Sequence, residues 1–146
     1  HHWNAVSERA LAGGRERAIQ AVLQDPEAQA ESLRGIVPDA LTGPLRGIAK
    51  LGARQLRRKY GEGQVVELEA GLEQLRATLD GRDYLLDEFS YADIAMAVVF
   101  EFVEPSAHVR RGVAERRAWS DARLAARYAD LVEWRDQLWA RPGWKK

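Results

Sequence analysis

Apolar residues recur at intervals of three and four along much of the chain, which is the spacing of a buried helix face. Two stripes are the clearest. The first consists of Val65, Leu68, Leu72, Leu75 and Leu79. The second consists of Leu124, Tyr128, Leu131, Trp134 and Leu138. The alternation of period two that is typical of strands is nearly absent. The pattern predicts a helix over 65–79 and one long final helix, which Ser120 or Asp121 would cap.

Residues that start and stop helices divide the first third of the chain. Asn4 or Ser7 is expected to cap a helix that runs to about Gln24, with Gly13-Gly14 as a weak spot. Asp25-Pro26 is typical of a helix start, with Asp as the cap and Pro at the first helical position.

The short helix that Asp25-Pro26 begins is expected to end at Gly35. A further helix is predicted from about 42 to 60, with Gly61 at its end. Asp80-Gly81 is predicted to be a turn. Residues 107–119 are rich in arginine and predict a short helix plus a loop.

The most specific local pattern is Phe89-Ser90-Tyr91-Ala92-Asp93-Ile94. Ser90 can cap a helix through the N–H of Asp93, and the Asp93 carboxylate can reach back to the N–H of Ser90. Phe89 and Ile94 have the spacing of a hydrophobic staple. The helix that follows is apolar on every side, so we expect it to be buried on every side and to end near Glu104-Pro105.

These elements indicate a single all-α domain over residues 1–146. Five or more helices with short connections bury their apolar stripes against one another, and 146 residues suffice for one substantial core. The expected architecture is a five- to six-helix bundle.

The order of motifs resembles the all-helical C-terminal domain of the glutathione S-transferase superfamily. The resemblance covers residues 62–144 well and the first sixty more loosely. It lies in Leu79-Asp80-Gly81-Arg82-Asp83-Tyr84-Leu85-Leu86, in the Ser90/Asp93 box, in Tyr128-x-x-Leu131-x-x-Trp134 and in Arg141-Pro142. The family usually has Gly where this chain has Asp87, at a position expected to need left-handed backbone. Asp tolerates that conformation better than most residues.

The resemblance implies that catalysis and glutathione binding belong to a different domain from this one. In the superfamily the activating Ser, Tyr or Cys and the glutathione-binding residues lie mostly in a thioredoxin-like N-terminal domain, and nothing in this chain has that pattern. We therefore assign no catalytic, cofactor-binding or metal-binding residue here. The helical domain would form one wall of the cleft for the electrophilic substrate. It would also supply part of a homodimer interface, mainly through residues 4–24 and 42–78.

Composition excludes several classes of function. Lys plus Arg and Asp plus Glu each number 22, so no net charge steers the chain toward nucleic acid. The absence of cysteine excludes disulfides and thiolate metal sites. The longest apolar run, from Ile94 to Phe100, is too short for a membrane span. No signal peptide is apparent, so the cytoplasm is the expected location.

The strongest charge feature is a basic stripe of four residues at intervals of four: Arg46, Lys50, Arg54 and Arg58. One interpretation is a contact for an anionic partner such as a phospholipid, a phosphorylated substrate or nucleic acid. The other, which we favour, is a solvated face that pairs with the acidic residues of the next helix, Glu62, Glu67, Glu69, Glu73 and Asp80. Aromatic residues that could stack on bases are missing from the stripe.

Two functions remain open. The chain is either the C-terminal substrate-cleft and dimerisation domain of a glutathione S-transferase-like protein, or a free-standing helical protein-interaction module without catalytic activity. Transferase activity, with glutathione as co-substrate, is expected only of a parent protein that carries a thioredoxin-like domain. His108, the only histidine after the first two positions, has no carboxylate or second histidine nearby in sequence and is a poor catalytic candidate.

Overall fold

The computed structural model describes residues 2–34 and 65–142. Within these ranges the protein is all-helical, with seven α-helices, one short 3-10 turn and no strand. The predicted helix over 42–60 lies outside the described residues, and so does its basic stripe of Arg46, Lys50, Arg54 and Arg58. The helices outnumber the five or six expected because the predicted final helix is two helices.

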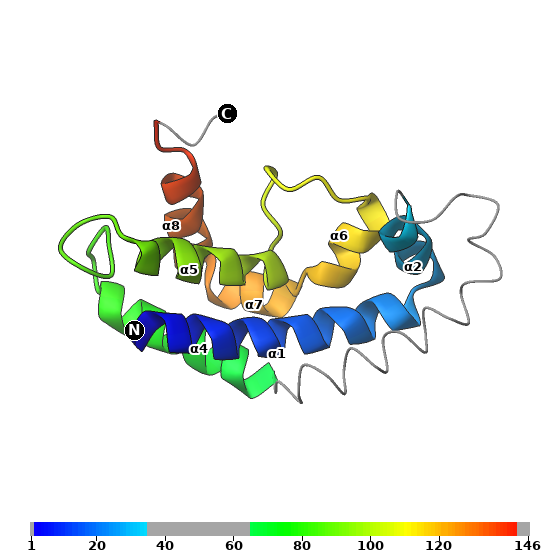
Figure 1. Ribbon diagram of the computed structural model, residues 1–146, viewed down its shortest axis with the longest axis horizontal. Coiled ribbons are helices and arrows are strands. Elements are labelled where there is room, and N and C mark those ends of the chain that lie inside the picture. The colour runs from blue at the N-terminus through cyan, green and yellow to red at the C-terminus, as the bar shows by residue number, and fades with distance from the viewer. Residues whose placement is uncertain (1, 35–64, 143–146) are drawn as a thin grey trace.

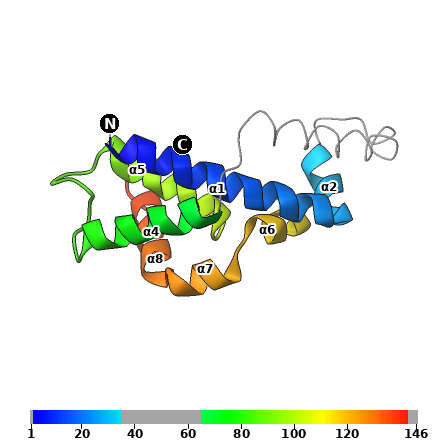
Figure 2. The same ribbon diagram turned by 90° about the horizontal axis from the view of Figure 1, so that it is seen from below.

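The longest of the described helices, α1 (His2–Gln24), spans most of the length of the fold (Figure 1). Helix α4 (Val65–Leu79) lies antiparallel beside it, and α5 (Tyr91–Val99) runs in the same direction as α1. Both views place these three helices side by side (Figure 2), and α1 contacts α4 and α5. Helix α1 also contacts α2 and α6, so most of the described elements pack against it.

Helix α1 begins at His2, so the prediction of a cap at Asn4 or Ser7 is wrong. Ser7 is buried inside the helix, where its hydroxyl donates to the Asn4 carbonyl at 2.9 Å. The helix continues without a break through Gly13-Gly14. At Gly14 the missing side chain makes room for Phe102, because a Cβ there would lie 2.6 Å from the Phe102 Cβ.

The start predicted at Asp25-Pro26 is confirmed. Helix α2 (Pro26–Leu33) has Asp25 as its cap, and the carboxylate accepts hydrogen bonds from the N–H groups of Glu27 and Ala28 at 3.0 and 3.2 Å. Helix α2 packs on α6 (Val113–Trp119), which follows a loop as predicted. The buried alanines Ala28, Ala114 and Ala118 form this small second core.

The leucine stripe of α4 is confirmed for the residues whose side chains are described. Leu68, Leu72 and Leu75 are fully buried, and Leu79 is 5% exposed. They join the main core with residues of α1, α5 and the C-terminal helices. Asp80 and Gly81, with φ of 31° and 80°, form the predicted turn after the helix.

The expectation that the helix after Ser90 is buried on every side is wrong. Met96, Ala97 and Val99 are fully buried, but Tyr91 is 68% exposed and Val98 is 38% exposed. Helix α5 contacts α1 on one flank and α8 on another. An apolar sequence indicates that a helix buries part of its surface. The number of helices that pack against it determines how large that part is. The chain continues after α5 as a 3-10 turn, η2 (Phe100–Phe102), close to the predicted end.

The predicted final helix is two helices, α7 (Ala122–Arg127) and α8 (Ala129–Trp139). Asp121 caps α7 by accepting the N–H of Leu124 at 3.1 Å. Tyr128 interrupts the helix with φ −116° and ψ 34°. The inner stripe from Leu124 to Leu138 is nonetheless buried, since the break redirects the chain without removing Tyr128 from the core.

We expect the substitution Gly14→Ala to destabilise the protein by about 1–3 kcal/mol, because the added methyl group overlaps Phe102. Helix preference alone predicts the opposite, since Ala is favoured over Gly by about 1 kcal/mol inside a helix. Denaturant unfolding measures the difference. Ala77→Gly, at an exposed position of α4, is the control for helix preference without packing. A more stable Gly14→Ala protein would contradict the close approach.

Candidate functional site

The Asp93 carboxylate accepts three hydrogen bonds in a fully buried position. Asp93 is fully buried in the first turn of α5. One oxygen accepts the N–H of Leu85 at 2.8 Å, and the other accepts the N–H and the hydroxyl of Ser90, both at 2.8 Å. The Ser90 hydroxyl in turn accepts the N–H of Ala92 at 3.3 Å, and both halves of a capping box are present.

Asp93 therefore acts on two segments at once. Its bonds to Ser90 begin helix α5, and its bond to Leu85 fixes the loop that precedes the helix. All three bonds use donors of the same chain, so the arrangement is that of a structural anchor and not of a general base.

Side chains from the end of the chain close over the same loop. The Trp134 indole N–H donates to the carbonyl of Asp83 at 2.9 Å. The Arg141 guanidinium carbon lies 4.4 Å from the centre of the Phe89 ring and 5.0 Å from that of Tyr84, whose hydroxyl accepts a hydrogen bond from Arg141. Trp134 and Arg141, which lie about fifty residues further along the chain, thus contact the loop that precedes α5.

The backbone of this loop differs from the expectation for Asp87. Among the described residues Asp80 is the one non-glycine with positive φ, so Asp87 does not adopt left-handed backbone. The tight turn is made earlier, by Asp80 and Gly81, and the rest of the loop is held by Asp93 and Trp134. Phe89 packs against the main core and Ile94 is half-buried. Their pairing as a staple stays a prediction.

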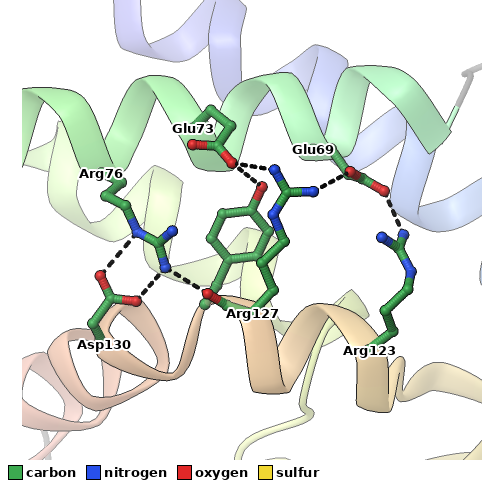
Figure 3. A network of polar contacts seen from close by, with 7 residues as sticks. Glu69, Glu73, Arg76, Arg123, Arg127 and Asp130 are labelled. Atoms are coloured by element: carbon green, nitrogen blue, oxygen red, sulfur yellow. Dashed lines mark hydrogen bonds and ion pairs between the residues drawn. The ribbon is translucent and has the colours of Figure 1, made fainter.

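A network of ion pairs joins α4 to α7 and α8 (Figure 3). Arg76 forms a two-pronged contact with Asp130, with Nε 2.9 Å and Nη2 2.5 Å from the carboxylate oxygens. Arg127 lies between the two acids of α4, with Nη1 3.0 Å from Glu69 and Nη2 2.7 Å from Glu73. Arg123 also contacts Glu69. Exposed ion pairs contribute little singly, but a network with two-pronged geometry contributes more.

Tyr128 connects this network to the core. Its ring is fully buried, and its hydroxyl donates to Glu73 at 2.7 Å. Burial and this hydrogen bond raise the pKa of Tyr128 to about 12. The same hydrogen bond, together with Arg127, lowers the pKa of Glu73, and Arg76 lowers the pKa of Asp130.

The acidic face of α4 has partners other than those expected. Glu69 and Glu73 pair with Arg127 of α7, and Glu67 lies 3.7 Å from Arg9 of α1. Whether these acids also pair with the basic stripe stays a prediction, because the stripe lies outside the described residues. The spacing of residues along one helix shows that it has a charged face. Which residues pair with that face depends on the helices that pack beside it.

Several classes of site have no support in the part of the chain that the structure describes. Residues 2–34 and 65–142 contain no group of three or more His, Asp or Glu side chains placed to hold a metal ion. No described helix is long and apolar enough to cross a bilayer. His108 is exposed in the loop between η2 and α6 and lines a cavity with Arg116 and Arg135.

Sequence reasoning missed three features of this region: the bond from Leu85 to Asp93, the packing of Arg141 on Phe89, and the bond from Tyr128 to Glu73. The first has a weak local signal, because a capping-box Asp has a second oxygen that needs a donor. The other two join residues more than fifty positions apart and have none.

Comparison of the chain with protein families, with curated proteins and with solved structures finds no match.

We expect Asp93→Ala to destabilise the protein by about 2–4 kcal/mol, because it leaves two backbone N–H groups without an acceptor, one of them buried. Ser90→Ala removes the cap hydroxyl and keeps the Leu85 bond, so a loss of about 1 kcal/mol is expected. Asp93→Asn should fall between the two. Denaturant unfolding gives the free energies, and amide exchange at Leu85 reports the bond directly. Equal losses for Asp93→Ala and Ser90→Ala would refute the double anchor.

The Tyr128–Glu73 bond predicts a loss of stability in alkali. The pKa of Tyr128 is raised from 10.0 in the unfolded chain to about 12, so its contribution is complete below pH 10 and is lost as the pH rises toward 12. Tyr128→Phe should remove this alkaline phase and about 1 kcal/mol at neutral pH. Thermal unfolding against pH and tyrosinate absorbance measure both effects. Tyr91→Phe, at an exposed ring, is the control, and an unchanged alkaline phase in Tyr128→Phe would contradict the assignment.

Proposed function

We propose that this chain is the helical domain of a glutathione S-transferase-like protein, in which it forms one wall of the electrophile cleft and part of a dimer interface. In that role it carries no reacting group. A thioredoxin-like domain of the parent protein would bind and activate glutathione.

One observation supports the proposal above the others. The segments that resemble the superfamily meet around Asp93: the loop with Tyr84 and Leu85, the Ser90 cap, and Trp134 and Arg141 of the closing helix. A chance similarity of sequence letters gives no reason for these segments to contact one another. The hydrogen bonds give each quoted residue a physical task in the same piece of structure.

A free-standing helical interaction module is the second candidate, and a different observation favours it. Tyr91 and Val98 lie seven residues apart on one face of α5 and are both exposed, and Leu86 of the preceding loop is 52% exposed. Exposed apolar side chains grouped in this way are typical of surfaces that bind another protein.

The test that separates the candidates is the coding sequence directly upstream of the codon for His1 in the native locus. An in-frame thioredoxin-like segment, with a proline turn before a strand, is the expected result. A start codon at or near Trp3 would overturn the proposal and leave the interaction module.

We expect residues 1–146 alone to show no glutathione conjugation with a general aromatic electrophile, and the parent protein to show it. A coupled absorbance assay measures both proteins at equal concentration. Asp93→Ala in the parent should lower the melting temperature before it lowers the rate at permissive temperature, because Asp93 is an anchor. Conjugation by the isolated chain would contradict the assignment of the chemistry to another domain.

A further inference from the structure

A cavity of about 330 Å³ lies beside the loop that joins η2 to α6, the loop that rises above α5 in Figure 1. Its lining comes from three elements: the loop residues from Glu104 to His108, Arg116 of α6, and Arg135 and Asp136 of α8. The volume is at the lower end of the range for small-molecule sites, about 300–1,000 Å³. The site is independent of the Asp93 cluster and of the α4 ion-pair network.

Arg135 is the unusual member of this lining. Only 1% of it is exposed, and it is the largest fully buried side chain among the described residues. Its Nε donates to Asp136 at 2.7 Å, and its Nη1 donates to the Glu104 carbonyl at 2.7 Å. Within the described ranges these are its acceptors, and no hydrogen bond of Nη2 is described. Nη2 is not among the fully buried atoms that lack a partner, which fits a group that water or a ligand can reach. A buried guanidinium has five N–H donors, and leaving some of them unpaired is unfavourable unless water or a ligand accepts.

Arg116 adds a second charge to the same cavity. Its guanidinium donates to three backbone carbonyls of the loop, those of Pro105, Ser106 and Val109. Among the described residues it forms no ion pair with a carboxylate. Carbonyl dipoles fix the position of the group but leave its full charge in place. Two arginines therefore face one cavity, and the single carboxylate paired with them, Asp136, is 60% exposed.

The acidic groups of the lining limit the charge of an occupant. Glu104 and Asp136 line the cavity as well, so a dianion such as phosphate would meet like charges. A carboxylate has one charge and two oxygens that match the planar fork of an arginine. Pro105 and Ala107 provide apolar wall for the rest of such a molecule.

From this geometry we propose that the cavity binds a small molecule through a single carboxylate, which accepts hydrogen bonds from Nη2 of Arg135 and is attracted by Arg116. His108 stands at the same wall and is exposed, so it can donate a further hydrogen bond. This site goes beyond the proposed function, because it requires neither a second domain nor glutathione.

The test is an NMR titration of the ¹⁵N-labelled chain with acetate, with sodium phosphate and with sodium chloride at constant ionic strength. Acetate is expected to shift the amides of residues 104–108 and the Nε–H signal of Arg135 in a saturable way, with an affinity in the millimolar range, about 1–10 mM. Phosphate should bind more weakly. Equal or tighter binding of phosphate would overturn the assignment to a single carboxylate, and absence of saturation with acetate would overturn the site.

Two variants test the position of the ligand. Arg135→Lys keeps the charge and removes the planar fork, and about a tenfold loss of acetate affinity is expected. Ala107→Asp adds a negative charge at an exposed lining position without removing a buried group, and should weaken acetate binding by a similar factor. Ala126→Asp, at an exposed position of α7 outside the lining, is the matched control.

If Arg135→Lys fails to fold, the acetate affinities of Ala107→Asp and Ala126→Asp are compared to test the site. Loss of acetate binding in Ala107→Asp alone supports the cavity. Equal binding by both aspartate variants, or an equal loss in both, would overturn it.

Discussion

The close approach of α1 to its neighbours is the constraint on which the rest of the fold depends. Small residues line the contacts of α1: a Cβ added to Gly71 of α4 would lie 2.9 Å from the Ala10 methyl group, and one added to Gly14 would lie 2.6 Å from Phe102. Because α1 also contacts α2, α5 and α6, the distances set at these points determine where these neighbouring helices can lie. Interiors are packed as densely as organic crystals, so a helix pushed outward at one point opens voids at the others.

Contacts between small apolar residues fix how closely two helices approach. Buried hydrogen bonds fix how the neighbouring segments are oriented. Arg17 of α1 donates to the carbonyls of Phe102 and Ser120 at 2.7 and 2.9 Å, which ties the ends of η2 and α6 to the middle of α1. Asp93 does the same for the loop before α5, and Trp134 joins that loop to α8. Each bond satisfies a backbone group that packing would otherwise leave without a partner, so the alternative arrangements are disfavoured by the loss of several hydrogen bonds.

The sequence predicted those parts of the structure whose causes are local. The leucine stripe of α4 and the Asp25-Pro26 start follow from spacing and capping chemistry, which act within a few residues. The break at Tyr128 has no local signal: the apolar spacing from Leu124 to Leu138 fits one helix as well as two, and the burial of Tyr128 against Glu73 decides the matter. The exposure of Tyr91 and the pairing of Glu69 with Arg127 depend on which helices are neighbours, and periodicity does not contain that information.

In this fold a buried charged group has a structural role when its hydrogen bonds are made within the chain. It is suited to bind a ligand when some of them are not. Asp93 belongs to the most specific pattern of the sequence, yet it is fully buried and both of its oxygens accept hydrogen bonds from the same chain, so neither oxygen is presented to a substrate. Arg135 carried no sequence signal, because arginine on a C-terminal helix is ordinary. It is buried like Asp93, but no hydrogen bond of Nη2 is described and the side chain lines a cavity. A buried charge whose hydrogen-bonding capacity is filled stabilises a fold, and one whose capacity is unfilled and faces open space is suited to bind a ligand of opposite charge.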